Sequence, residues 1–123
     1  MESKTDLATA YWDAVSAMDA DDVASRFTEQ ASFRFGNTPA LRGRPAIRRA
    51  FVELFGRIIY IACKPVAEWG GESCMVAEAD LLVVFEDGRR LAIPITTVLR
   101  SHRGRIQDCR IQFYPEPALE PAR

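Results

Sequence analysis

Two carboxylates, Glu78 and Asp80, are the residues of this chain whose types and spacing could do chemistry. Residues two apart in a strand share one face, so the two acids would lie side by side at the start of the apolar run 81–85. Among apolar side chains, loss of hydration raises the pKa of a carboxyl group, and a second acid raises it further. One of the pair could then hold a proton near neutral pH, beside an ionised partner that acts as a base. The alternative is that both acids face water or pair with an arginine such as Arg110.

The strand that carries these acids belongs to a predicted antiparallel meander. Its three apolar stretches, 78–85, 91–99 and 105–113, are separated by turn sequences that contain Gly88 and Gly104, where a hairpin needs a positive φ. The first two strands are apolar on both faces, so both faces need a cover. We expect the chain's own helices to cover one face. We expect a second copy, in a homodimer, to cover the outer face through Ala79, Leu81, Val83, Phe85 and Ile93.

Helical periodicity precedes the meander. Leu7, Tyr11 and Val15 recur at helical spacing and predict a first helix over about residues 5–18. A short second helix is predicted next, capped within Asp19–Asp22 and carrying Val23 and Phe27. A strand over 31–35 and a loop over 36–39 lead to a third helix, from Pro45 to about Ile58. A strand over 60–69 precedes the meander, and an extended tail over 115–123 with three prolines follows it.

Composition narrows the class of protein. A chain of 123 residues that is 48% hydrophobic fits one globular domain, residues 1–123. A formal net charge of −1 gives no basic surface for nucleic acid. The absence of a signal peptide and of a long apolar run predicts a cytoplasmic protein without a membrane segment. Three cysteines without CxxC spacing and a single histidine predict neither a disulfide framework nor a transition-metal site, and we expect no cofactor.

The order helix, helix, strand, helix and meander predicts an α+β fold with helices on one face of a curved sheet. Three segments, Tyr11 to Phe27, Leu41 to Ile47 and Gly104-Arg-Ile106, resemble the NTF2-like superfamily. Within it the chain is similar to the SnoaL-like group, which includes polyketide cyclases, ketosteroid isomerases and limonene-epoxide hydrolases. The resemblance extends over about residues 5–114. It implies a cone, three N-terminal helices packed on a curved, mainly antiparallel sheet, whose mouth admits a small hydrophobic molecule, often in a dimer.

The resemblance also implies where site residues would lie. The tyrosine of the ketosteroid isomerases matches Tyr11, but their base falls at Phe35 and their second oxyanion acid at Thr96. One aspartate of the epoxide hydrolases matches Asp80, while Glu78 stands at the position of their arginine. Besides the polar groups Tyr11, Glu78 and Asp80, the expected pocket is lined by Phe33, Phe35, Phe51, Leu82, Val84, Thr96, Val98, Ile111 and Phe113.

Two functions are compatible with this sequence. The first is cofactor-free acid/base chemistry (isomerisation, cyclisation, dehydration or hydrolysis) on a hydrophobic oxygenated metabolite, with Asp80 as acid/base, Glu78 tuning its pKa and Tyr11 donating to an oxyanion. The second is a non-catalytic module for ligand binding or dimerisation, favoured because Phe, Ile and Thr stand at expected polar positions. We favour the enzyme, because the acids are expected to face an apolar wall. Tyr11 could instead be a core residue with its hydroxyl tied down, and Trp12 and Trp69 could line the pocket or the dimer contact.

Overall fold

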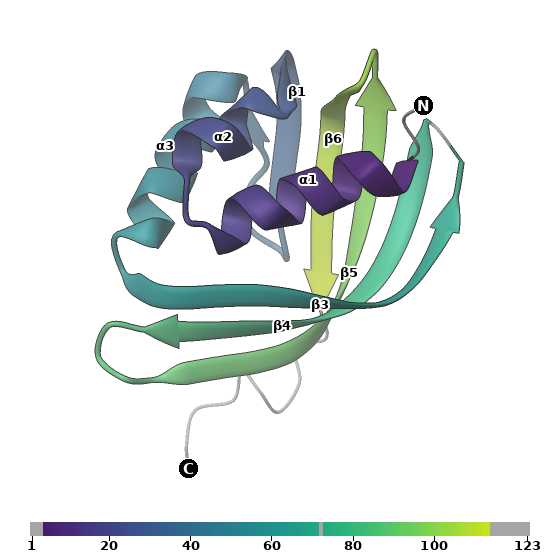
Figure 1. Cartoon of the computed structure of the whole chain (residues 1–123). Helices are drawn as coiled ribbons and strands as arrows, with labels where there is room; N and C mark the ends of the chain where they lie inside the picture. Colours follow the sequence, from purple (N-terminus) through teal and green to yellow (C-terminus); the bar gives the residue numbers. More distant parts are fainter. Residues whose placement is uncertain (1–3, 72, 114–123) are drawn as a thin grey trace.

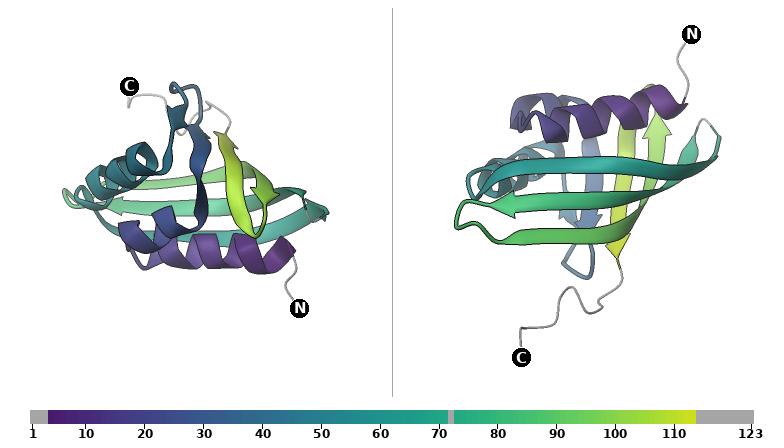
Figure 2. Two further views of the ribbon diagram at one scale, coloured as in Figure 1. Left: turned by 90° about the horizontal axis from the view of Figure 1, so that it is seen from above. Right: turned by 60° about the horizontal axis from the view of Figure 1, so that its bottom comes forward.

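The computed structural model describes residues 4–71 and 73–113, so the expected tail over 115–123 lies outside the described residues. Six strands form one sheet in the order β2-β1-β6-β5-β4-β3. Figure 1 shows the three helices gathered on one side of this sheet, and Figure 2 shows the sheet curving around them, which confirms the expected α+β architecture. The elements are α1 (Lys4–Ser16), α2 (Ala20–Ser25), β1 (Phe27–Phe35), β2 (Leu41–Arg42), α3 (Arg44–Phe55), β3 (Ile58–Gly70), β4 (Cys74–Phe85), β5 (Arg90–His102) and β6 (Arg105–Phe113).

Several local predictions are confirmed. Asp19 caps α2, because its Oδ1 accepts a hydrogen bond from the backbone N–H of Asp22 at 3.0 Å. Strands β3 to β6 pair in sequence as an antiparallel meander. Gly88 and Gly104 turn between them with φ of +92° and +80°. None of the described helices is long and apolar enough to cross a membrane.

The expectation that Phe27 belongs to the second helix is wrong. Helix α2 ends at Ser25, and Phe27 opens β1 by pairing in parallel with Ile106 of β6. This pairing joins distant parts of the chain, so the local residue pattern around Phe27 does not reveal it. Ile58 likewise lies outside α3, which stops at Phe55, and begins β3.

A run of buried aromatic rings joins the helices to the sheet. Tyr11 of α1 meets Phe27 of β1, Phe27 meets Phe33 further along the same strand, and Phe33 meets Phe51 of α3. The ring centroids are 5.9, 6.2 and 5.4 Å apart, and each pair is edge-on. Pairs in this geometry contribute about 0.5–1.5 kcal/mol each beyond the area they bury. The run therefore fixes how α1 and α3 lie against β1.

The two faces of β4 and β5 are reversed relative to the prediction. In β4 the small residues beside the acids, such as Ala79, are buried, whereas Glu78 and Asp80 are exposed. Because both alternating sets of residues 81–85 are apolar, hydrophobic alternation does not decide which set faces the helices, and the charged pair decides it by staying in water. The residues expected to meet a second copy face the helix side instead, namely Ala79, Leu81, Val83, Phe85 and Ile93.

Two adjacent threonines of β5 test this assignment of faces. Thr97 is 1% exposed on the inner face, and its Oγ1 has no hydrogen-bond partner among the described residues, whereas Thr96 lies half-buried on the outer face. Thr97→Val removes an unsatisfied buried hydroxyl at constant shape, so we expect it to raise the free energy of unfolding by about 1 kcal/mol. Thr96→Val is the control and should change it by less than ~0.5 kcal/mol. Urea denaturation measures both, and a loss of stability in Thr97→Val would contradict the assignment.

Candidate functional site

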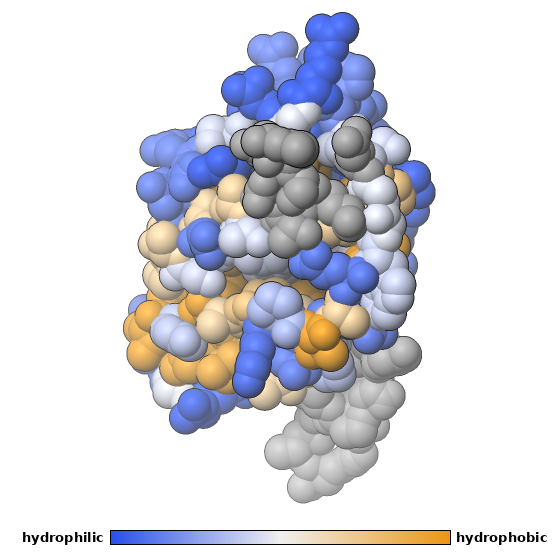
Figure 3. All heavy atoms as spheres, turned by 45° about the vertical axis from the view of Figure 1, so that its right-hand side comes forward, coloured by the Kyte–Doolittle hydropathy of each residue, from blue (hydrophilic) through white to orange (hydrophobic). Residues whose placement is uncertain are grey.

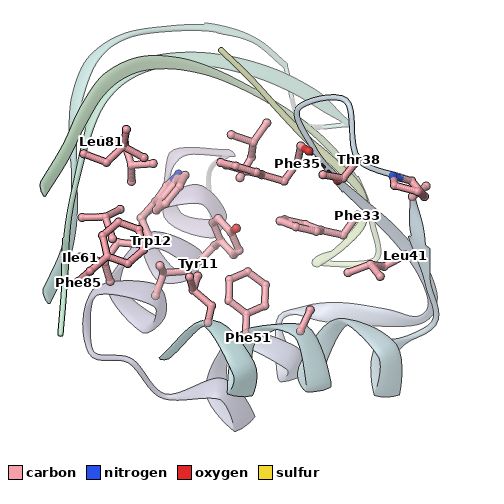
Figure 4. Close-up of a pocket in the computed structure, with 18 residues that line it drawn as sticks. Tyr11, Trp12, Phe33, Phe35, Thr38, Leu41, Phe51, Ile61, Leu81 and Phe85 are labelled. Carbon is pink, nitrogen blue, oxygen red and sulfur yellow. Dashed lines mark hydrogen bonds between the residues drawn. The ribbon is translucent and has the colours of Figure 1, made fainter. Parts of the chain in front are cut away.

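A cavity of about 530 Å³ lies between the helices and the inner face of the sheet. Figure 4 shows side chains from both layers around one hollow. The helices contribute Tyr11, Trp12 and Phe51, and the sheet contributes Leu81 and Phe85. The segment 38–41, which follows β1 and includes the first residue of β2, supplies another part of the wall. Among the described residues that line the cavity there is no Asp, Glu, His, Lys or Arg. The cavity wall is therefore apolar and aromatic, with a few uncharged polar groups.

The structure brings together only part of the predicted pocket. Tyr11, Phe33, Phe35, Phe51 and Ile111 line the cavity. Phe113 packs its ring against that of Phe35, with centroids 5.1 Å apart, but borders a different hollow, the one that Glu78 and Asp80 also border. The expectation that the other four residues line the cavity is wrong, because they lie on the outer faces of β4 and β5: Leu82, Val84, Thr96 and Val98.

The acid pair also lies on the outer face. Glu78 and Asp80 border a groove of about 700 Å³, in which Thr96 and Gln112 continue the row of side chains that starts at Glu78. Both carboxylates are exposed to solvent. The expectation that they share an apolar pocket with Tyr11 is wrong, because the sheet itself separates them from the cavity.

The alternative ion pair of these acids with Arg110 is not formed. The Nε of Arg110 lies 3.1 Å from Oδ2 of Asp108, on its own strand. Across the strand ladder, the residue opposite Asp80 is Lys64 of β3. The acids thus remain open to water along one side of the groove.

Tyr11 supplies a neutral donor at the cavity. Its side chain is fully buried, and its hydroxyl donates a hydrogen bond to the thiol of Cys109. Burial, more than the nearby thiols, holds the pKa of Tyr11 well above its usual value, and burial likewise raises the pKa of Cys109. Burial and then the charge of Asp80 raise the pKa of Cys63 to about 12. These groups stay uncharged at neutral pH, so none of them acts as a base there.

Two parts of the cavity wall were not predicted. The sequence left the position of Trp12 undecided, and it gave no indication that the segment 38–41 lines the cavity. Trp12 borders the cavity and packs edge-on against Tyr11, with centroids 4.9 Å apart, whereas Trp69 is 52% exposed on β3. Trp12 stands four residues after buried Ala8 and three before buried Val15, so helical spacing places it on the apolar face of α1 without deciding what it contacts there. The segment 38–41 has a turn-like composition, with Pro39 at its centre, that gives no sign of a wall. Within residues 4–71 and 73–113, no group of three or more His, Cys, Asp or Glu side chains could hold a metal ion.

The chain is similar to one protein family and to several solved structures. The family model of the SnoaL-like domain matches residues 8–109. A candidate polyketide cyclase from Xanthomonas campestris pv. campestris superposes with a TM-score of 0.81 at 16% identity, covering 90% of both chains. A protein of ketosteroid isomerase-like fold from Catenulispora acidiphila, solved with trimethylamine, gives 0.81 at 14% identity over 94% of this chain and 97% of that one. An LEH-like epoxide hydrolase of M. tuberculosis gives 0.79 at 17% identity over 88% and 80%. At these identities the likeness shows the fold alone, and no curated protein matches the chain.

The buried Tyr11 hydroxyl predicts a pH-dependent effect. Tyr11→Phe loses the bond to Cys109, so we expect the free energy of unfolding to fall by about 1 kcal/mol at pH 7. Because the folded pKa of Tyr11 is raised, its contribution is full below the unfolded pKa of about 10 and is lost as the pH rises above it. The difference between wild type and Tyr11→Phe should therefore shrink between pH 8 and pH 11 in urea titrations. Tyr60→Phe, which removes a hydroxyl from a side chain that is 51% exposed, is the control. A difference that grows with pH would contradict the burial of Tyr11.

Proposed function

Because this chain belongs to the SnoaL-like domain family, we propose that its interior cavity binds one uncharged, largely hydrophobic small molecule that carries an oxygen acceptor. The observation that carries this proposal is the cavity itself, which is lined by aromatic and aliphatic side chains and bordered by two residues that carry a hydrogen-bond donor, Tyr11 and Trp12. A volume of about 530 Å³ falls within the range of pockets that hold small molecules, about 300–1,000 Å³.

The lining favours a ligand without charge. A charged group that leaves water needs an opposite charge or several hydrogen bonds to offset its lost hydration. No charged side chain lines the cavity among the described residues, so an ion would find no such partner. Phe33, Phe35 and Phe51 instead offer ring faces and edges against which a flat apolar molecule can pack.

The polar groups favour an acceptor on that ligand. The Tyr11 hydroxyl donates to the sulfur of Cys109, and sulfur is a weak acceptor. A carbonyl or ether oxygen in the cavity is a stronger acceptor, so the hydroxyl gains by turning toward it. Trp12 borders the same cavity, and its indole N–H can only donate. Two donors at one end of an apolar cavity would orient an oxygenated molecule.

Catalysis in the same cavity is the second candidate. The family, and neighbours described as a candidate polyketide cyclase and an epoxide hydrolase, support an enzymatic role at the level of the family. A reaction in the cavity would depend on Tyr11 as donor to an oxygen that gains negative charge, and on the walls to fold a flexible substrate. Asp80 and Glu78 have no part in this version of the chemistry, because they border the groove on the other side of the sheet.

Binding in the cavity is tested by two adjacent valines of β4. Val83 borders the cavity and is 5% exposed, whereas Val84 lies half-buried on the outer face. We expect N-phenyl-1-naphthylamine, an uncharged fluorescent probe, to bind the wild type with enhanced emission. Val83→Phe should weaken this binding roughly 10-fold or more by filling the cavity, and Val84→Phe should leave it unchanged. Equal effects of the two substitutions, or no binding by the wild type, would overturn the proposal.

The preference for an acceptor is tested with two probes of one shape. 2-Acetylnaphthalene carries a carbonyl oxygen where 2-isopropenylnaphthalene carries a methylene group. One hydrogen bond contributes about 0.5–1.5 kcal/mol, so the ketone should bind roughly 2- to 12-fold more tightly. Calorimetry should show that Tyr11→Phe or Trp12→Phe brings this ratio close to one, while Tyr60→Phe does not. If the wild type binds both probes equally, the proposed preference for an oxygen acceptor is wrong, although the cavity can still bind apolar molecules.

A further inference from the structure

Strand β5 has an open edge over its first residues. Its ladder with β6 begins at Ile95, which pairs with Phe113, whereas its ladder with β4 extends to Arg90. Among the described residues, positions 90–94 therefore have a neighbouring strand on the β4 side alone. The backbone groups on such an edge are a template for another extended segment.

One hydrogen bond shows which backbone groups point to the open edge. The N–H of Phe85, the last residue of β4, donates to the carbonyl oxygen of Arg89 at 2.8 Å. Backbone groups point alternately to the two sides of a strand, and the register between β4 and β5 runs without a shift. The odd-numbered residues of β5 therefore face β4, and the open edge is faced by Arg90, Ala92 and Pro94. Because proline has no N–H, the backbone donors on this edge belong to Arg90 and Ala92.

The sequence after β6 carries its prolines in the alternation that this edge requires. The N–H of Gly36 donates to the carbonyl oxygen of Ile111 at 2.7 Å, so the odd-numbered residues at the end of β6 face β1 and the even-numbered ones face β5. Continued along the sequence, this alternation would turn Pro115 and Pro117 away from β5. Proline fits a strand where no N–H is needed for the ladder. The residues that would face β5 all carry an N–H: Tyr114, Glu116 and Ala118.

The side chains of the two prolines suit the inner face of the sheet. If the register continues, Pro115 pairs with Ile93 and Pro117 pairs with Leu91. Residues that pair directly across strands share a face, and Ile93 and Leu91 face the helices, where Leu91 borders the cavity. Two apolar rings at these positions would extend the apolar wall of the cavity.

The outer face beside this edge also offers partners. Four apolar residues of that face border a hollow of about 410 Å³: Ala62, Leu82, Ala92 and Pro94. Figure 3 shows apolar side chains gathered among hydrophilic ones in the lower half of the molecule, where β3 to β5 run in Figure 1. Opposite Pro94, Tyr114 would add an aromatic ring to this apolar surface. Glu116 would lie diagonal to the exposed Arg90, and opposite charges in such cross-strand positions attract.

We propose that residues 114–118 continue β6 and dock on the open edge of β5, opposite residues 94–90. Residues 114–123 follow β6 directly and lie outside the described residues, and the first five of them match the open edge residue for residue, so no connecting loop is needed. In this position Pro115 and Pro117 leave the new outer edge without donors where they stand, which protects it against pairing with another chain. The segment also becomes part of the cavity wall beside Leu91, and this second part rests on the proposed function.

Amide hydrogen exchange tests the docking without any ligand. We expect the N–H of Ala92 to exchange roughly 10-fold or more slowly in the full chain than in a chain that stops after Phe113. A chain that stops after Ala118 keeps the docking segment and should protect Ala92 as the full chain does. The N–H of Ile93 faces β4 and should be protected in all three chains, which shows that the shortened ones are folded. Equal exchange at Ala92 in the full chain and in the shortest chain would overturn the proposal.

Two substitutions at one position test the pairing in the full chain. Glu116→Pro removes the N–H that would face β5, so the exchange of Ala92 should rise to the rate found in the chain that stops after Phe113. Glu116→Gln keeps that N–H and should leave Ala92 protected, since an exposed ion pair with Arg90 contributes little. Protection of Ala92 that survives Glu116→Pro would contradict the proposed register.

The role in the cavity wall is tested with N-phenyl-1-naphthylamine. The chain that stops after Phe113 should bind this probe roughly 10-fold or more weakly than the full chain, the scale on which one apolar contact changes binding. The chain that stops after Ala118 should bind it as the full chain does. Equal binding by the full and the shortest chain would overturn the role in the wall. Failure of the full chain to bind the probe would overturn the proposed function and the wall with it, while hydrogen exchange still decides the docking.

Discussion

The structure depends on edge-on contacts between buried aromatic rings. Tyr11, Phe27, Phe33 and Phe51 form one continuous run from α1 through β1 to α3. Phe33 and Phe51, which belong to this run, also line the cavity, so the same rings that hold α3 against the sheet form part of its wall. The parallel pairing of β1 with β6 then brings β1, and the rings it carries, to the sheet that the meander builds. A smaller residue at Phe33 would remove contacts to both neighbouring rings at once.

The sequence predicted the elements better than it predicted their faces. Helical spacing around Tyr11, the cap at Asp19 and the turns at Gly88 and Gly104 are local signals, and the structure confirms them. The strand start at Phe27 depends on a partner far along the chain, which no local pattern encodes. The faces of β4 and β5 were predicted in reverse because residues 81–85 are apolar on both sides. Neighbouring residues of a strand point to opposite faces, so an error of one residue exchanges the whole set of lining residues. The prediction therefore placed Leu82 and Val84 at the cavity, where the structure has Leu81 and Val83.

That exchange changes the chemistry available to the chain. Glu78 and Asp80 lie on the outer face, open to water, and the cavity keeps only neutral donors. Tyr11 was the one predicted polar residue that the structure places at the cavity, and its hydroxyl is tied to Cys109 as the alternative prediction had it. Recognition by shape and by hydrogen bonds to an acceptor therefore fits the interior. Recognition by charge fits the exterior.

The segment that links β1 to β2 belongs to both of these surfaces. Gly36 and Asn37 border the outer groove, while Thr38 and Leu41 border the cavity. Two side-chain hydrogen bonds help to hold the turn, from Thr38 Oγ1 to the backbone oxygen of Phe35 at 2.7 Å and from Arg34 to the backbone oxygen of Thr38 at 3.0 Å. The segment 36–41 is thus a partition between the cavity and the outer groove. A shift of this segment toward one of them would change the wall of both. Linkage would make any coupling through this partition reciprocal, because a molecule on one side that changed affinity on the other would have its own affinity changed by the same factor.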